Sequence, residues 1–148
     1  MLLIFISFII LTSVILALWE IQIEGENGWA EKLPCWQIKE GLIVKIMGGR
    51  PLTGYHAAMI SFLVVIIHLP VIFTGFSLQM EFLLFGFLAG TLLVEDFLWF
   101  VFNPAYGLKR FKKGELWWHK NWLGPVPIEY WGYLAITILL IWLGRPAL

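Results

Sequence analysis

Two consecutive acids, Glu95 and Asp96, lie inside a long apolar stretch of this 148-residue chain. A charged group at the centre of a membrane helix costs roughly 2.5–3.5 kcal/mol on insertion scales, so such residues are normally paired, protonated or bound to a metal. Neighbouring residues of a helix point about 100° apart. Glu95 and Asp96 therefore need two different partners, and we expect them to be the catalytic residues at the centre of a site.

Five more acids and imidazoles lie near the ends of apolar stretches, on what would be the same side of a membrane. Two of them follow the first stretch, just past its end, and are four residues apart, so they share a face if the chain is helical there. Glu115 and His119 have the same spacing in the loop before the last stretch. The five residues are Glu20, Glu24, His56, His119 and Glu129.

Carboxylates and imidazoles that project from several helices are typical ligands of iron or manganese. We expect a divalent metal (iron, manganese or zinc), although the chain contains no Glu-x-x-His motif. Without a cation, carboxyl groups among apolar walls would act as proton donors instead. The expected metal ligands are Glu20, Glu24, His56, Glu95, Asp96, His119 and Glu129.

Some of these residues also have a purely structural interpretation. Glu129 follows Pro127 at a helix start, where a carboxylate complements the helix dipole. The carboxylates after the first stretch can be interfacial groups paired with Lys or Arg, and His56 and His119 can be hydrogen-bonded interface residues. His68, two residues before Pro70, is expected at a kink, where it can bond a carbonyl group freed by the proline.

The composition requires a membrane. Hydrophobic residues make up 60% of the chain and charged residues 14%, with a mean hydropathy of +0.84, whereas soluble domains have about 25% charged residues. This composition excludes a nucleic-acid binder, so no nucleic-acid partner is expected, and the formal net charge of zero indicates nothing about a partner. Three histidines without a facing pair argue against haem, and the chain has no phosphate-binding Gly-Lys-Ser/Thr loop, so no nucleotide is expected either.

The fold class predicted is an all-α integral membrane protein, with four helices in one compact bundle. A span needs about 20 apolar residues, and the candidate spans are residues 1–19, 55–76, 82–102 and 128–143, of which the last is the shortest. Ile38, Leu42 and Ile46 recur one turn apart in the segment that joins the first two spans. This spacing predicts a short amphipathic helix that lies at the membrane interface.

Charge predicts the orientation of the bundle. Four spans put both termini on one side, and nine of the ten Lys and Arg residues lie in residues 20–54 and 103–127 on the other side. Because Lys and Arg favour the cytoplasm, we expect both long loops to be cytoplasmic and both termini to be outside.

Two surfaces are expected to have partners. Residues 109–113 are basic and precede Trp117, Trp118 and Trp122, a combination that attracts anionic lipid headgroups. Gly86 and Gly90 form a small-x-x-x-small pair that lets another helix approach closely.

Residues 93–100, Leu-Val-Glu-Asp-Phe-Leu-Trp-Phe, resemble the Pro-Val-Glu-(Glu/Asp)-x-x-Phe-Phe signature of the membrane lycopene cyclase domain, with Leu93 in place of the proline. Pro-Ile-Glu-Tyr-Trp at residues 127–131 is a fainter echo of the same signature. The resemblance implies acid–base roles for Glu95, Asp96 and Glu129 on a polyene, without a metal.

The function expected from these observations is that of a small membrane enzyme, metal-dependent, acting on a lipid or isoprenoid-like substrate. One alternative is a non-catalytic subunit or assembly factor, in which the polar cluster is a buried latch. A weaker alternative is an acid–base enzyme without metal, similar to lycopene cyclase. A transporter or proton path is a further option, although the chain has no inverted repeat.

Overall fold

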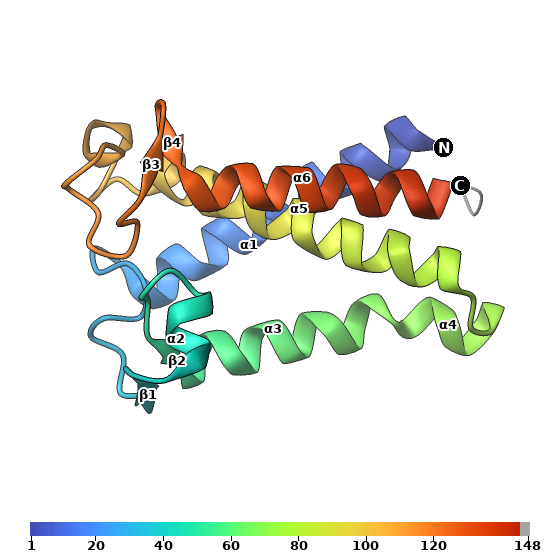
Figure 1. The fold of residues 1–148 in the computed structure, drawn as a ribbon, viewed down its shortest axis with the longest axis horizontal. Helices are drawn as coiled ribbons and strands as arrows, with labels where there is room; N and C mark the ends of the chain where they lie inside the picture. The colour runs from blue at the N-terminus through green and yellow to red at the C-terminus, as the bar shows by residue number, and fades with distance from the viewer. Residues whose placement is uncertain (146–148) are drawn as a thin grey trace.

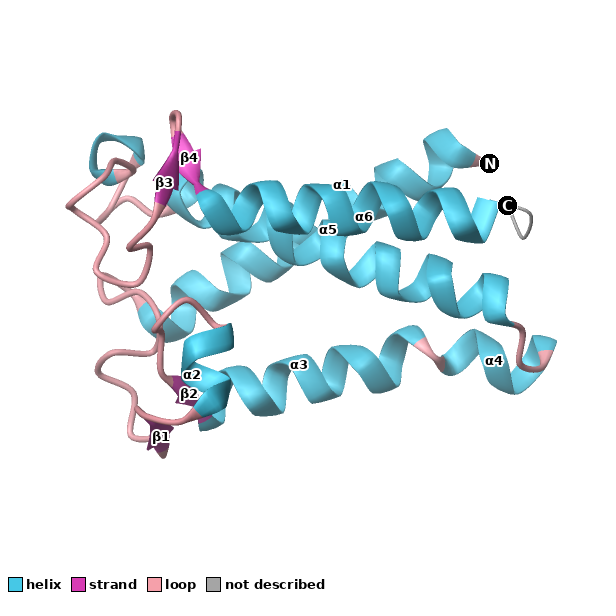
Figure 2. Ribbon diagram, in the orientation of Figure 1, coloured by secondary structure: helices cyan, strands magenta, loops and turns pink. Residues whose placement is uncertain are grey.

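The computed structural model describes residues 1–145, in which long helices lie roughly along one direction (Figures 1 and 2). The start of α1, the end of α6 and the α4–α5 turn lie at one end, and the two long loops lie at the other, which we call the loop end (Figure 1). The helices are α1 (Leu2–Glu24), α2 (Leu42–Ile46), α3 (Gly54–Ile67), α4 (Leu69–Thr74), α5 (Leu78–Phe102), η1 (Leu108–Arg110, a 3-10 helix) and α6 (Ile128–Gly144).

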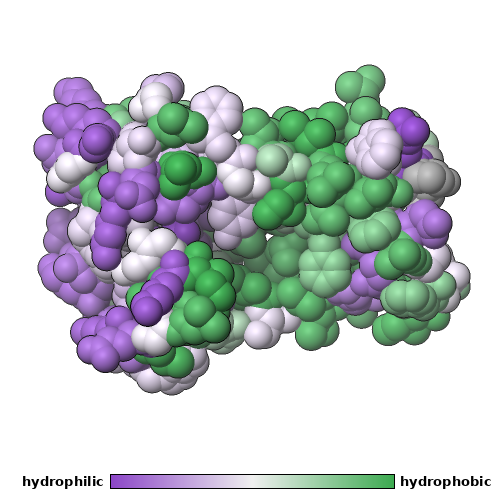
Figure 3. All heavy atoms as spheres, in the orientation of Figure 1, coloured by the Kyte–Doolittle hydropathy of each residue, from purple (hydrophilic) through white to green (hydrophobic). Residues whose placement is uncertain are grey.

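Three helical segments are long and apolar enough to cross a membrane, namely Leu2–Glu24, Gly54–Thr74 and Leu78–Phe102. Helix α6 is also apolar, and its 17 residues extend about 26 Å at 1.5 Å per residue. Hydrophobic residues form a band around the middle of the molecule, and hydrophilic residues gather towards its two ends (Figure 3). These features agree with a helical membrane protein.

Glycines allow α5 to pack closely against two other helices. A Cβ atom added at Gly90 would lie 3.1 Å from Thr137 of α6 and 3.2 Å from Ile9 of α1, and one at Gly86 would lie 3.2 Å from Ile141. Small residues let helix backbones approach in this way. The helix that the Gly86 and Gly90 pair was predicted to admit is therefore α6 of the same chain, with α1 beside it.

Helices α3 and α4 form one broken apolar segment that packs loosely against the other helices. The break is at His68, whose backbone N–H bonds Val65 O at 3.3 Å while its Nδ1 lies 2.6 Å from Val64 O. Its Nε2 is 3.0 Å from Glu81 at the start of α5. The predicted kink is confirmed, because the imidazole bonds a carbonyl group that the irregular turn leaves free.

Helix α1 is longer than the sequence suggested. It continues to Glu24, so Glu20 and Glu24 lie on its last turns and not beyond its end. Both side chains are buried. Because both have partners inside the protein, described below, the helix can extend past Trp19 without exposing a carboxylate to lipid.

The predicted interfacial helix is a single turn, because Ile38 belongs to a strand. Strands β1 (Gln37–Ile38) and β2 (Leu52–Thr53) pair antiparallel, and Gly41, with φ of 100°, starts α2. Leu42 and Ile46 are exposed, so this turn does present apolar side chains outward. A second pair joins β3 (Trp122–Leu123) to β4 (Val126–Pro127).

An aromatic core holds the second loop against the end of α5. Trp99 and Phe100 pack on Tyr106, Leu116 and Trp118, all of which are buried. Trp118 is therefore a core residue and not the headgroup anchor that the sequence suggested, whereas Trp117 and residues 109–110 are exposed. The reason is that Trp118 stacks on Phe100 with ring centroids 6.1 Å apart, which removes it from solvent.

We predict that Gly90→Val destabilises the protein by about 1–3 kcal/mol, because a larger side chain overpacks the contact between α1, α5 and α6. Gly132→Val in α6 is the matched control, since a Cβ atom there meets no atom within 4 Å. Thermal unfolding in detergent measures both changes. Equal midpoints for the two variants would contradict the close packing at Gly90.

Candidate functional site

A cavity of about 90 Å³ lies at the loop end, between α1, α3, α5, α6 and both long loops. This volume accommodates several water molecules or a small polar group. All seven predicted site residues line it: Glu20, Glu24, His56, Glu95, Asp96, His119 and Glu129. Glu115 does not, because residues 115–119 are not helical and its carboxylate faces Lys112 Nζ at 3.7 Å.

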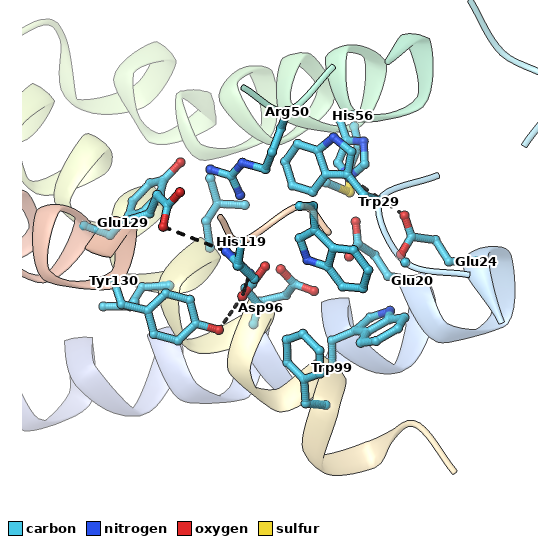
Figure 4. Close-up of a pocket in the computed structure, with 18 of the residues that line it drawn as sticks. Glu20, Glu24, Trp29, Arg50, His56, Asp96, Trp99, His119, Glu129 and Tyr130 are labelled. Atoms are coloured by element: carbon cyan, nitrogen blue, oxygen red, sulfur yellow. Dashed lines mark hydrogen bonds and ion pairs between the residues drawn. The ribbon is translucent and has the colours of Figure 1, made fainter. Parts of the chain in front are cut away.

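Asp96 is held by partners from two other segments. Its Oδ2 lies 3.2 Å from His119 Nε2 and also accepts a hydrogen bond from the Tyr130 hydroxyl. His119 comes from the second loop and Tyr130 from the first turn of α6, as Figure 4 shows. The carboxylate favours the tautomer with its proton on Nε2, which leaves the Nδ1 lone pair of a neutral ring free to accept a proton.

The free nitrogen of His119 faces a second carboxylate. Its Nδ1 lies 3.9 Å from Glu129 Oε2, which is beyond hydrogen-bond distance. Neither this nitrogen nor either carboxylate oxygen of Glu129 has a hydrogen-bond partner among residues 1–145, although all three are buried. A substrate hydroxyl or a water molecule between these atoms could hydrogen-bond both, and a proton could pass between them.

Glu95 points to a different neighbour from Asp96. Its carboxyl group faces that of Glu20 on α1, and Tyr55 donates to Glu20 Oε1 at 3.2 Å. Two adjacent carboxyl groups are stable in a buried place when they share a proton. Glu95 and Asp96 thus face different neighbours, although Glu95 Oε1 has no hydrogen-bond partner among residues 1–145.

On the opposite wall, Glu24 and His56 are fixed by local structure. Trp29 and Ala30 both have left-handed backbone, with φ of 59° and 51°, and this turn lets the Ala30 N–H donate to Glu24 Oε1 at 2.5 Å. His56 lies 3.8 Å from the same oxygen, stacks on Trp29 and hydrogen-bonds the N-cap residue Thr53 at 2.7 Å. Left-handed non-glycine residues concentrate at functional sites.

Arg50 lines the cavity and was not among the predicted site residues. Its guanidinium lies over the Trp29 ring at 4.4 Å, and Trp29 Nε1 donates to Pro51 O at 2.8 Å. The sequence showed only a Gly-Gly-Arg-Pro turn. From the sequence, Arg50 is one of the charged residues of the first long loop. Its burial depends on how the two long loops pack together, which the sequence does not show.

The ligand geometry expected of a metal centre is not formed. Within the described chain, no group of three or more His, Cys, Asp or Glu side chains is placed to hold a metal ion. Among the residues that line the cavity, the other approaches between an imidazole and a carboxylate, apart from the direct Asp96–His119 bond, are 3.8 and 3.9 Å at two separate places. The arrangement is instead suited to moving protons between neighbouring groups.

Comparison with known proteins finds no matching family model, no similar curated protein and no similar solved structure.

Asp96→Ala is predicted to destabilise the protein by about 1–3 kcal/mol, because it leaves the buried imidazole of His119 without an acceptor. Asp96→Asn keeps an acceptor oxygen and should therefore lower the stability less than Asp96→Ala does. Glu115→Ala removes an exposed carboxylate and should have almost no effect. Thermal unfolding of the three variants in detergent provides the measurement, and equal losses for Asp96→Ala and Glu115→Ala would show that the contact is not formed.

Proposed function

We propose that the chain is a membrane-embedded acid–base enzyme that acts on a lipid or isoprenoid-like substrate at the loop end of its helices. The observation that supports this most strongly is the Asp96–His119 pair, in which one ring nitrogen is held and the other faces the cavity without a partner. A carboxylate that orients an imidazole in this way makes it a general base that can return the proton as an acid.

The residues have distinct roles in this proposal. His119 exchanges a proton with the substrate at Nδ1, Asp96 positions the ring, and Tyr130 positions Asp96. Glu129 supplies or receives the second proton on the far side of the same space, 3.9 Å away. The Glu20 and Glu95 pair lines the cavity as a reserve of one shared proton.

The apolar lining supports a lipid-like substrate. Met59 and Ile60 of α3, Leu92 and Leu93 of α5, and Tyr133 of α6 line the membrane side of the cavity. Helix α3 is mostly exposed and contributes only His56 and Met59 to the buried residues. In this proposal, an alkyl or isoprenoid chain would lie along these apolar residues, with its polar end in the cavity beside His119.

The orientation forms part of the proposal. We propose that α6 is a fourth span and that the loop end is cytoplasmic, because nine of the ten Lys and Arg residues lie there in the sequence. The exposed residues Lys109 and Arg110 would then contact anionic headgroups. The substrate would be a lipid of the cytoplasmic leaflet.

The direct test is a comparison of lipid extracts from cells that express the wild-type protein or His119→Gln. We predict that at least one lipid changes in abundance with the wild-type protein, and that His119→Gln lowers this conversion about 10²–10⁴-fold because the general base is lost. Glu115→Gln serves as a control outside the cavity. If all three extracts have the same composition, the cluster is a structural latch of a non-catalytic subunit.

Metal dependence was expected from the sequence and has its own test. Because the acid–base proposal needs no cation, elemental analysis of the purified protein should give iron, manganese and zinc well below one per chain. Near-stoichiometric metal that is lost in Glu95→Ala or His119→Ala would replace this proposal by the metal-dependent enzyme. Glu115→Ala controls for metal bound at the surface.

A further inference from the structure

Arg50 is a buried cation whose charge has no direct counter-ion. Its side chain is only 7% exposed, and its Nε donates to Met47 O at 3.0 Å. The two terminal guanidinium nitrogens have neither a hydrogen-bond partner nor a carboxylate within 4.0 Å among the residues that the structure describes. A guanidinium in such a place without a close oxyanion is unfavourable, because a desolvated charge needs a partner of opposite charge.

The guanidinium is aimed into the cavity. In Figure 4 it extends from the first loop into the space between Glu129 and His119 on one side and Trp29 and His56 on the other. The Trp29 ring below it fixes its plane. In the described part of the chain, no other Lys or Arg lines this cavity.

Apart from Glu129, the acids of the cavity face other partners. Asp96 is bound by His119 and Tyr130, and Glu24 by the Ala30 N–H. Glu20 and Glu95 face each other across α1 and α5. Glu129 has two unpartnered carboxylate oxygens, but among the described residues its ion-pair contact is with His119 and not with Arg50. The guanidinium therefore lacks the planar pair of oxygens that it binds best.

We propose that Arg50 binds the anionic headgroup of the substrate, a phosphate or carboxylate carried on an apolar chain. This inference rests on the proposed function and names the class of its substrate. The headgroup oxygens would accept two parallel hydrogen bonds from the terminal nitrogens of Arg50, and the chain would pass between Met59 and Tyr133 towards the bilayer. The bond that reacts would lie next to the headgroup, within reach of His119.

Binding of four probes to the full chain in maltoside micelles tests this assignment. The probes are dodecyl phosphate, dodecanoate, dodecanol and inorganic phosphate, and the signal is the fluorescence of the tryptophans around the cavity, among them Trp29. At about pH 8 we expect one of the two anionic amphiphiles to bind about tenfold more tightly than dodecanol, because only an oxyanion engages both guanidinium nitrogens.

Variants assign that preference to Arg50. Arg50→Gln should bind the anionic amphiphile and dodecanol equally, whereas Arg50→Lys, which keeps a point charge, should keep part of the preference. Arg110→Gln is the matched control, because Arg110 also lies over an aromatic ring, that of Tyr106 at 4.1 Å, but is exposed outside the cavity. It should behave as the wild-type protein does.

Several outcomes would overturn the assignment. If the wild-type protein binds dodecanol as tightly as both anionic amphiphiles, the assignment is wrong, even where Arg50→Gln fails to fold. It is also wrong if a folded Arg50→Gln variant still prefers the anionic amphiphile to dodecanol. Inorganic phosphate that binds as tightly as dodecyl phosphate would show a site for a free anion instead. His119→Gln should keep the binding preference, so a failure of the proposed catalysis and a failure of headgroup binding are distinguishable.

Discussion

The carboxylate of Asp96 must be paired where it lies, and its pairing organises the loop end of the molecule. A carboxylate in an apolar helix is tolerated only with strong hydrogen-bond donors. Its donors come from the second loop, through His119, and from the start of α6, through Tyr130. One partly buried acid therefore links the second loop and the start of α6 to α5.

The cavity exists because the two halves of the molecule are joined mainly at the loop end. Helices α1, α5 and α6 pack closely around Gly86 and Gly90, whereas α3 is almost uncovered by the others. At the loop end, the two long loops contact each other, since Lys120 of the second loop donates to Gly49 O of the first loop at 3.0 Å. Asn103, which follows α5, donates to Gly25 O, which follows α1, at 2.7 Å. The cavity lies between these loops and the adjoining ends of the helices.

The sequence predicted the helices and the members of the polar cluster, because both follow from strong local signals. Long apolar stretches identify spans, and ionisable residues beside them are rare enough to mark a site. The packing of the loops could not be predicted in the same way. Trp118 was predicted to be a headgroup anchor and Arg50 was counted as a loop charge, because composition alone does not tell which loop side chains turn inward. The end of α1 was placed too early for the same reason, since Glu24 stays helical only because a left-handed turn at Ala30 supplies its donor.

The pattern of satisfied and unsatisfied atoms separates structural from reactive groups. A buried polar latch is stable when every member has a partner, and a partly satisfied network costs more than an apolar core. Asp96 and Glu24 meet that condition, as latch residues should. His119 Nδ1, both oxygens of Glu129 and Glu95 Oε1 do not, although all three residues line one cavity. Because free energy is lost at each of these atoms in the empty site, their concentration in one place favours a site that is completed by a ligand over a site that only holds helices together.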